Sequence, residues 1–303
     1  MNKIVAVVVT YNRKELLEEN IKALLNQSYE NLDILIIDNA STDGTEEVVK
    51  KYVSDKLKYM NTGANLGGAG GFNFGIRQAI ERNYDYCWVM DDDTIPTPTA
   101  LESLVNKTKI LNNDFSFLGS LVKWKDNKSI CKMNVQIINP NWLDEYEKID
   151  DRLINIERSS FVSCYINLEV AKKVGLPITQ FFIYGDDWEY TIRLGKVKKG
   201  YLDLDSVVIH KMKENVTADI VTIPKERVNR CYYNFRNTFY ISKRLGAIEV
   251  IKYPLIYIMW IFRVLFHSKD AKLKRIGALT KGFFAGIFFN PKIEFAMPKE
   301  NEE

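Results

Sequence analysis

The sequence predicts an α/β protein in which a mixed, mainly parallel sheet is flanked by helices and followed by a basic helical C-terminal part. Apolar, β-branched runs alternate with segments that carry leucine at helical spacing, which is typical of strand–helix–strand units. Polar and acidic residues follow the ends of several of these runs. The net charge then changes sign, from −5 over residues 1–224 to +11 over residues 225–292.

The first part of the chain contains two strand–helix units. Residues 4–9 form a continuous apolar run, which predicts a strand covered on both faces. Residues 15–26 have helical spacing, with Asn12 as a candidate N-cap. A second buried strand is expected over residues 32–37 and a helix over residues 45–52. Since parallel sheets bind ligands at the carboxyl ends of strands, the polar residues there are candidate site residues.

Three consecutive aspartates, Asp91, Asp92 and Asp93, end the apolar segment 86–90. Three adjacent carboxylates repel one another and are costly to desolvate, so they favour a compensating cation. Mg²⁺ or Mn²⁺ holding a diphosphate fits, because these hard ions take carboxylate and phosphate oxygens together. An acidic turn solvated by water explains the triplet equally well when it is taken alone.

A glycine-rich segment over residues 65–75 precedes a helix expected over residues 76–82. Such a turn presents bare backbone N–H groups to an anion, which makes Asn65, Gly67 and Gly68 candidate substrate-binding residues. A flexible loop explains the glycines equally well. The absence of a GxxxxGK[ST] pattern excludes a P-loop.

A second acidic group contains Asp186 and Asp187, just before a segment in which Glu189 and Arg193 are four residues apart. A helix there would pair Glu189 with Arg193 in the favourable direction and leave the two aspartates at its N-terminus. The alternative is a plain helix cap. His210 ends an expected short strand and suits a metal ligand, although a lone histidine is more often a partly buried structural residue.

The domain prediction places a catalytic domain at residues 1–224 and a basic, aromatic-rich helical region for membrane or acceptor contact at residues 225–303. The four cysteines lack CxxC spacing and lie in apolar surroundings, so buried thiols in a reducing compartment are expected. The N-terminus has no signal-peptide pattern, and a cytoplasmic location is expected. Residues 120–160 are expected to be β-rich with loops.

Aromatic and apolar residues are interleaved with lysine and arginine through residues 230–289. The longest apolar run falls short of the roughly 20 residues needed to cross a bilayer. The pattern favours helices lying on an anionic membrane surface. The alternative is a helical subdomain whose aromatic residues form their own core.

Taken in order, these motifs resemble those of inverting nucleotide-sugar glycosyltransferases of family 2, which have a GT-A fold. Residues 7–13 and 38–44 are similar to the opening of that family, and the resemblance covers roughly residues 3–215. Within the family, residues 65–72, the aspartate triplet, residues 186–189 and His210 are most similar to the galactofuranosyltransferase branch. Related rhamnosyltransferases share the glycine segment.

The resemblance implies roles on the donor side. Asp38 would accept a hydrogen bond from the base of the nucleotide, with Thr10 and Arg13 nearby. Mn²⁺ or Mg²⁺ would be held by Asp91, Asp93 and His210, with the donor diphosphate completing the shell. Asp92 would face the donor ribose or sugar.

The resemblance also implies roles on the acceptor side. Asp187 would be the general base that takes a proton from the acceptor hydroxyl, and the acceptor sugar would be bound by Asp186, Trp188 and Glu189. The galactofuranosyltransferases carry tryptophan ahead of the paired aspartates, whereas residues 161–165 contain none. Phe161 or Tyr165 is a candidate aromatic platform in its place.

The implied function is metal-dependent, inverting transfer of galactofuranose from UDP-galactofuranose to a glycan or lipid-linked acceptor in bacterial cell-surface polysaccharide synthesis. The location would be peripheral, on the inner face of the cell membrane. The sequence leaves the oligomeric state open. The alternatives are a dTDP-rhamnose-dependent rhamnosyltransferase and a catalytically silent nucleotide-sugar-binding scaffold. A nucleic-acid-binding protein with a basic C-terminal face would leave both aspartate clusters unexplained, so no nucleic acid partner is expected.

Overall fold

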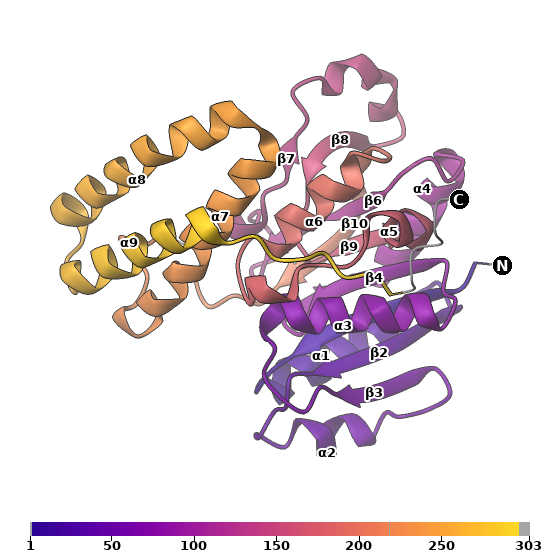
Figure 1. The fold of residues 1–303 in the computed structure, drawn as a ribbon. Helices are drawn as coiled ribbons and strands as arrows, with labels where there is room; N and C mark the ends of the chain where they lie inside the picture. The colour runs from indigo at the N-terminus through magenta and orange to yellow at the C-terminus, as the bar shows by residue number, and fades with distance from the viewer. Residues whose placement is uncertain (1, 218, 297–303) are drawn as a thin grey trace, which may run out of the picture.

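A mixed sheet forms the centre of the molecule in this computed structural model, which describes residues 2–217 and 219–296 (Figure 1). One half of the sheet is parallel, in the order β3-β2-β1-β4. These strands are β1 (Ile4–Thr10), β2 (Leu32–Asp38), β3 (Leu57–Asn61) and β4 (Tyr86–Asp91). The predicted parallel strand–helix units are therefore confirmed.

The other half of the sheet contains antiparallel neighbours and continues in the order β9-β6-β10-β8-β7, with the short β5 paired to β10. Strand β9 lies antiparallel between β4 and β6. These strands are β5 (Thr94–Pro96), β6 (Phe117–Trp124), β7 (Ile137–Ile138), β8 (Leu153–Arg158), β9 (Cys164–Asn167) and β10 (Gly200–His210). This half includes the β-rich stretch expected within residues 120–160.

Helices cover both faces of the sheet (Figure 1). Alternate residues of β1 enter two different cores: Val8 packs with α1 and α4 on one face, and Val7 packs with α3 and α6 on the other. Burial on both faces explains why the strand is apolar throughout. The flanking helices are α1 (Lys14–Leu25), α2 (Thr45–Lys50), α3 (Gly67–Glu81), α4 (Ala100–Ile110), α5 (Leu168–Val174) and α6 (Asp186–Gly195). Short 3₁₀ helices are η1 (Lys132–Asn134), η2 (Trp142–Ile149), η3 (Thr179–Phe181) and η4 (Lys225–Arg230).

Two local predictions are wrong. Asn12 does not cap α1, because its backbone is left-handed (φ 53°) and its side-chain oxygen accepts the N–H of Thr42 at 2.7 Å. The glycines do not form a turn ahead of a helix at residue 76, because α3 begins at Gly67 and includes them. A Cβ on Gly75 would lie 2.3 Å from Val7 Cγ1. The glycines thus let α3 pack directly against β1, and tertiary packing overrides their low helix propensity.

The C-terminal part consists of α7 (Cys231–Leu245), α8 (Ala247–His267) and α9 (Lys272–Phe288). These helices share small cores of their own, with Phe239, Tyr253 and Phe283 packed together. Glycines again permit close approach, since a Cβ on Gly286 would lie 2.7 Å from the Cβ of Phe239 on α7. The aromatic core that one of the two sequence interpretations expects is therefore present.

After α9 the chain returns to the α/β part, where Figure 1 shows it as a yellow segment running across the sheet domain. Glu294 accepts the N–H of Leu176 at 2.8 Å and pairs with Arg77 at 2.7 Å. The predicted division between residues 224 and 225 stays a prediction. The last residues of the predicted C-terminal region, 297–303, lie outside the described part of the chain. Within that part, no helix combines the length and the apolar character needed to cross a membrane.

Candidate active site

The candidate site lies at the carboxyl ends of the parallel strands. The register of the sheet places Thr10 beside Asp38 and Val9 beside Asp91. The chain leaves β4 through a tight turn at Asp92 and Asp93 and returns as β5. The strand ends thus bring together polar residues that are far apart in the sequence.

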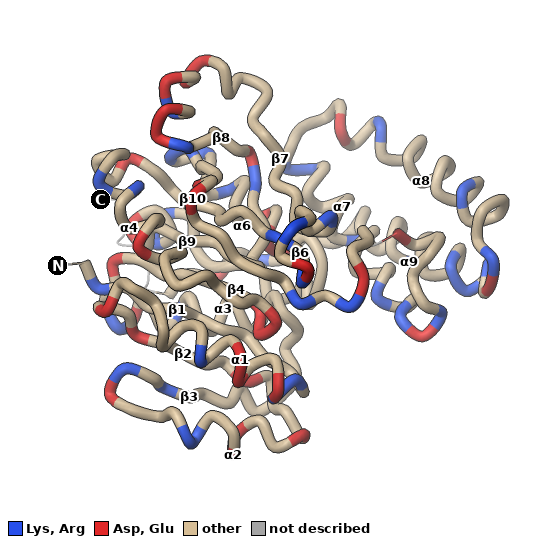
Figure 2. The backbone as a smooth tube through the Cα atoms, turned by 180° about the vertical axis from the view of Figure 1, so that it is seen from behind, with Lys and Arg blue, Asp and Glu red and all other residues tan. Residues whose placement is uncertain are grey.

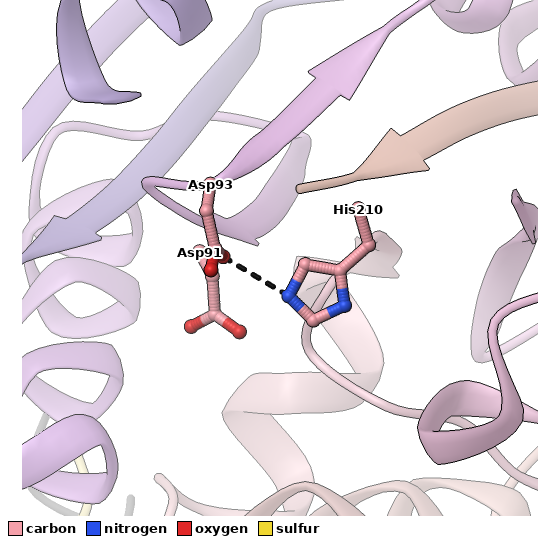
Figure 3. A group of neighbouring side chains, drawn as sticks. All are labelled: Asp91, Asp93 and His210. Atoms are coloured by element: carbon pink, nitrogen blue, oxygen red, sulfur yellow. Dashed lines mark hydrogen bonds and ion pairs between the residues drawn. The ribbon is translucent and has the colours of Figure 1, made fainter. Parts of the chain in front are cut away.

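Asp91, Asp93 and His210 form a compact group, with one ligand atom from each lying within 4.8 Å of the others (Figure 3). Strand β5 pairs antiparallel with β10, so His210 lies opposite Thr94, the residue after Asp93. His210 Nε2 lies 3.0 Å from Asp93 Oδ1. Two carboxylates and an imidazole converge as a donor set that suits a divalent cation.

A neighbouring asparagine orients the His210 ring. Asn134 donates from Nδ2 to Ser160 Oγ at 3.2 Å, so its Oδ1 faces the ring. Since that oxygen only accepts, His210 Nδ1 donates to it at 2.8 Å. Metal-binding histidines commonly donate their second ring nitrogen in this way, which turns the other nitrogen toward the ion.

The protonation of this group reflects its burial and its crowding. Burial, together with the nearby charge of Asp93, raises the pKa of Asp91. Burial lowers the pKa of His210, but the hydrogen bond to Asp93 outweighs it and raises the pKa to about 10. The pKa of Asp93 is lowered, because its interactions with His210 and Arg13 outweigh the cost of burial. In the absence of a cation, a protonated His210 and Arg13 supply the compensating positive charge.

Arg13 and Thr10 both contact the aspartate triplet. Arg13 Nη1 lies 2.6 Å from Asp93 Oδ2 and 3.2 Å from Asp92 Oδ1. Thr10 Oγ1 donates to Asp92 Oδ2 at 2.8 Å. The side chain of Arg13 is half-exposed, so it is also accessible from solvent.

Asp38, the expected partner of a nucleotide base, is buried and already engaged on both oxygens. Its Oδ1 accepts the N–H of Ser41 at 2.9 Å, and its Oδ2 accepts the hydroxyl of Tyr59 at 2.6 Å. A base can reach this carboxylate only beside or in place of Tyr59. The role of Asp38 stays a prediction.

The glycine segment offers fewer bare N–H groups than expected. Gly67 donates to Asn65 Oδ1 at 2.9 Å, and Ala69 donates to the carbonyl of Phe182 at 3.2 Å. Gly67 has a φ of +70°, and a Cβ there would lie 2.1 Å from that carbonyl. Gly68 has open space around its Cα. The segment therefore joins the donor side of the site to the loop of Phe182.

Asp186 and Asp187 occupy the first turn of α6, which follows Gly185 in a left-handed conformation. Burial raises the pKa of Asp186 well above its ordinary value, with Asp187 and Asp91 adding to the effect. Burial also raises the pKa of Asp187 to about 6, even though its carboxylate accepts the N–H of Trp188 at 2.8 Å. Asp91 is therefore close enough to Asp186 for its charge to contribute to this shift.

The acceptor-side aromatic residues differ from the expectation. Phe161 and Tyr165 are buried in the two cores, so neither can serve as a sugar platform. Trp188 is exposed, and the guanidinium of Arg158 stacks 4.1 Å from its ring centroid. Glu189 is buried and pairs with Arg193 at 2.8 Å, as the helical spacing predicts.

Arg193 also donates to the carbonyls of Val174 and Leu176. The Glu189–Arg193 pair thus ties α6 to the end of α5 and to the residues that follow it. We therefore leave Glu189 out of the proposed acceptor site.

Sequence reasoning misses Asn134 and Arg158. Arg158 ends β8, and its Nε is buried without a hydrogen-bond partner among the described residues. Burial lowers the pKa of Arg158, while the charge of Asp187 raises it. An isolated asparagine or arginine has no pattern in the sequence, so only the fold could reveal these two.

Comparison with known proteins identifies the family. The sequence model described as Glycosyl transferase family 2 matches residues 5–166, just over half of the chain. The chain belongs to glycosyltransferase family 2. This family-2 glycosyltransferase is 23% identical to the galactofuranosyltransferase GlfT1 of Mycolicibacterium smegmatis over 290 residues, which cover 86% of this chain and 89% of that protein. It is 34% identical to the abequosyltransferase RfbV of Salmonella typhimurium over 167 residues, 52% of this chain and 46% of that protein.

Solved structures show that the family-2 glycosyltransferase has a GT-A fold. The mannosyltransferase PcManGT from Pyrobaculum calidifontis, solved in complex with GDP-Man and Mn²⁺, superimposes with a TM-score of 0.56 at 16% identity, covering 96% of this chain and 76% of that one. GalNAc-T7, solved with UDP, GalNAc and Mn²⁺, gives a TM-score of 0.62 at 12% identity, covering 80% of this chain and 48% of that one. The predicted fold class and the predicted family are confirmed.

Proposed function

We propose that this protein is an inverting, metal-dependent galactofuranosyltransferase. It transfers galactofuranose from UDP-galactofuranose to a glycan or lipid-linked acceptor in bacterial cell-surface polysaccharide synthesis. The observation that carries the proposal is the convergence of Asp91, Asp93 and His210 at the strand ends of the sheet. The likeness to GlfT1 over most of both chains supports the choice of donor.

The compact group of Asp91, Asp93 and His210, here named the corner, fits a divalent cation. Ligand atoms of Asp91, Asp93 and His210, one from each, lie within 4.8 Å of one another, and Asn134 fixes the histidine tautomer that metal binding requires. Mn²⁺ or Mg²⁺ bound there would supply Lewis-acid stabilisation of the departing nucleoside diphosphate. Arg13 would contribute a second positive charge on the phosphate side.

Asp187 is the proposed general base. It would take the proton of the acceptor hydroxyl as that oxygen bonds to the anomeric carbon and the bond from this carbon to the diphosphate oxygen breaks. Its pKa of about 6 leaves it ionised at neutral pH yet basic enough to accept a proton. Asp186 and Trp188 lie beside it and would bind the acceptor sugar.

A donor screen tests the proposal. The purified protein is mixed with Mn²⁺ and UDP-, dTDP- or GDP-sugars, and thermal shift and nucleoside-diphosphate release are measured. We expect stabilisation by UDP-galactofuranose that EDTA reverses, and release of UDP when an acceptor is added. Preference for dTDP-rhamnose would replace the donor assignment, and binding without turnover on any acceptor would indicate a silent scaffold.

We also propose that the exposed face of α8 contacts an anionic membrane. The inner side of α8 packs in the helical unit, whereas its outer side exposes a stripe of large apolar residues at helical spacing. The stripe consists of Ile248, Ile251, Leu255, Ile258, Met259, Phe262 and Phe266. Lys252 and Arg263 lie on the same helix, Lys269 lies in the turn before α9, and Lys272 and Lys274 lie at the start of α9. Figure 2 shows blue segments along α8 and around the turn into α9.

This arrangement is complementary to a lipid surface. An apolar stripe flanked by lysine and arginine suits a helix lying in the interface of anionic lipids. Acidic residues are few over residues 247–288, and both are paired: Glu249 with Lys252 and Asp270 with Arg275. A lipid-bound acceptor would then be close to the enzyme that uses it.

Liposome co-sedimentation tests the membrane proposal with a matched pair of variants. Leu255 is 69% exposed on α8 and Leu143 is 61% exposed on η2, so the same change to glutamate is tolerated at both. We expect Leu255→Glu to reduce binding to vesicles containing phosphatidylglycerol and Leu143→Glu to leave it unchanged. Equal binding of both variants, or association of the wild type into dimers through this stripe, would contradict the lipid assignment.

A further inference from the structure

One residue of the C-terminal helices makes several contacts with the loop that leads into α6. Asn237 of α7 is fully buried, and its Nδ2 donates to the carbonyls of Phe181, Ile183 and Tyr184 at 3.0, 3.1 and 2.8 Å. The two N–H groups of this amide are thus shared among three carbonyl oxygens. The loop they hold ends at Gly185, immediately before the proposed general base and its neighbour.

Arg236 fixes the orientation of this amide and adds contacts of its own. Its Nε donates to Asn237 Oδ1 at 3.0 Å, which leaves Asn237 Nδ2 facing the loop. Its Nη2 donates to the carbonyl of Gln180 at 2.5 Å. The guanidinium is held in place by Phe289, whose ring centroid lies 4.0 Å away. The contacts that hold the loop therefore come from α7 and also involve Phe289, the residue after α9.

The loop needs such support because its backbone is strained. Phe182 has φ 62° and ψ −57°, and Ile183 donates to the carbonyl of Phe181 at 2.7 Å. This is the rare γ-turn of positive φ. Tyr184 (φ 68°) and Gly185 (φ +80°) follow it in left-handed conformations. Non-glycine residues persist in such conformations only where surrounding contacts determine them.

The opposite side of the loop contacts the donor half of the site. The carbonyl of Phe182 accepts the N–H of Ala69 in the first turn of α3, and Gly67 approaches the same carbonyl too closely for a side chain. The ring of Phe182 stacks on Tyr233 of α7 at 5.1 Å. The loop is thus enclosed between α3 and α7.

We infer that Asn237, supported by Arg236, is a positioning residue that sets the place of Asp187 by holding the strained loop at residues 181–184. This inference rests on the proposed role of Asp187. The hydrogen bonds of Asn237 determine where α6 begins, and hence where the Asp187 carboxylate meets an acceptor hydroxyl. Through Asn237, the C-terminal helices therefore contribute to the position of the base.

The test compares Asn237→Asp with Asn234→Asp in the full-length protein. The first change keeps the shape of the side chain but removes its N–H donors and sets a carboxylate against three carbonyls. The second makes the same chemical and charge change about one turn earlier on α7, where Asn234 accepts a hydrogen bond from Thr238 at 3.3 Å and its amide donates none to the described residues. We expect kcat to fall by about 10-fold or more in Asn237→Asp, as a small displacement of a catalytic group can cause. KM for the donor should change little, and Asn234→Asp should resemble the wild type.

Hydrogen exchange gives a readout that does not depend on turnover. Amides of residues 181–189 should exchange faster in Asn237→Asp, while those of β1 and β4 keep their wild-type protection. Unchanged exchange and kcat, or a uniform loss of protection and donor affinity across the protein, would overturn the inference. If Asn237→Asp does not fold, Asn237→Ser is measured in its place. A wild type that never turns over, with local exchange still altered in the variant, would refute the proposed function and leave the loop-holding role of Asn237 intact.

Discussion

The two acidic sides of the site are built in different ways. Asp91, Asp93 and His210 lie at or beside the ends of strands whose register fixes them in the sheet. Asp187 instead follows a loop with positive-φ residues, and that loop depends on Asn237, about fifty residues later in the chain. The first side is therefore positioned by the sheet, and the second is positioned by contacts between its loop and helix α7.

This difference suggests a division of labour. A cation and diphosphate require ligands at fixed distances, which strand ends provide. An acceptor hydroxyl must meet the base at one position, and the contacts of the loop with α7 and α3 set that position. Substitutions at the corner should therefore act on donor binding, and substitutions at the loop or base should act on turnover.

The largest effect is expected for Asp187→Asn. The amide cannot accept the acceptor proton, so kcat should fall by roughly 10²- to 10⁴-fold. Binding of UDP with Mn²⁺, measured by calorimetry, should stay close to wild type because the corner is unchanged. Turnover comparable to wild type would remove Asp187 from its role and end the contrast between the two sides.

At the corner, Asp93→Asn should weaken Mn²⁺-dependent UDP binding by about 10- to 100-fold, in line with the loss of groups that hold or orient a metal ligand. Asp92→Asn is the matched control, because Asp92 is adjacent and its oxygens contact Thr10 and Arg13 instead of the metal group. We expect Asp92→Asn to retain most of the Mn²⁺ dependence. Identical calorimetric titrations for wild type and Asp93→Asn would exclude the proposed metal ligands.

Gly67 lies where the two sides meet. Gly67→Ala forces a side chain into a left-handed position and against the carbonyl of Phe182, so the free energy of unfolding should fall by about 1–3 kcal/mol. Gly68→Ala is the control, since a Cβ there meets nothing within 4 Å and alanine favours the helix. Chemical denaturation measures both variants. Equal stabilities would mean that the donor helix and the base loop are not tightly packed.

Much of the corner could be predicted from the sequence, because local patterns mark the strands that carry its residues. The apolar run before Asp91 and the strand before His210 are visible as patterns, and strand ends of one sheet meet at one edge. The pairing of Glu189 with Arg193 follows from helical spacing alone. The resemblance to family-2 glycosyltransferases adds the prediction that these separate motifs belong to one site.

The base side could not be predicted in the same way. The strained loop, Arg158 and Asn237 become meaningful only through contacts between distant segments, and single asparagines and arginines show no periodicity. The prediction of a glycine-rich turn at residues 65–75 is wrong for a related reason. Its glycines indicate close packing of α3 on β1 and on Phe182, and nothing in the sequence separates that use from a phosphate-binding turn.

The smallest predicted effect concerns the pH dependence of turnover. Because the pKa of Asp187 is about 6, the base should become protonated and kcat should fall as the pH drops through 6. The positive charge of Arg158 lowers the pKa of Asp187, so Arg158→Gln should raise it and move the acidic limb of the kcat profile to higher pH. Arg152→Gln removes the same charge at the other end of β8, where Arg152 pairs with Asp205, and should leave the limb in place. An acidic limb at the same pH in all three proteins would show that Arg158 does not lower the pKa of Asp187. Burial and the backbone N–H groups of α6 would then set that pKa.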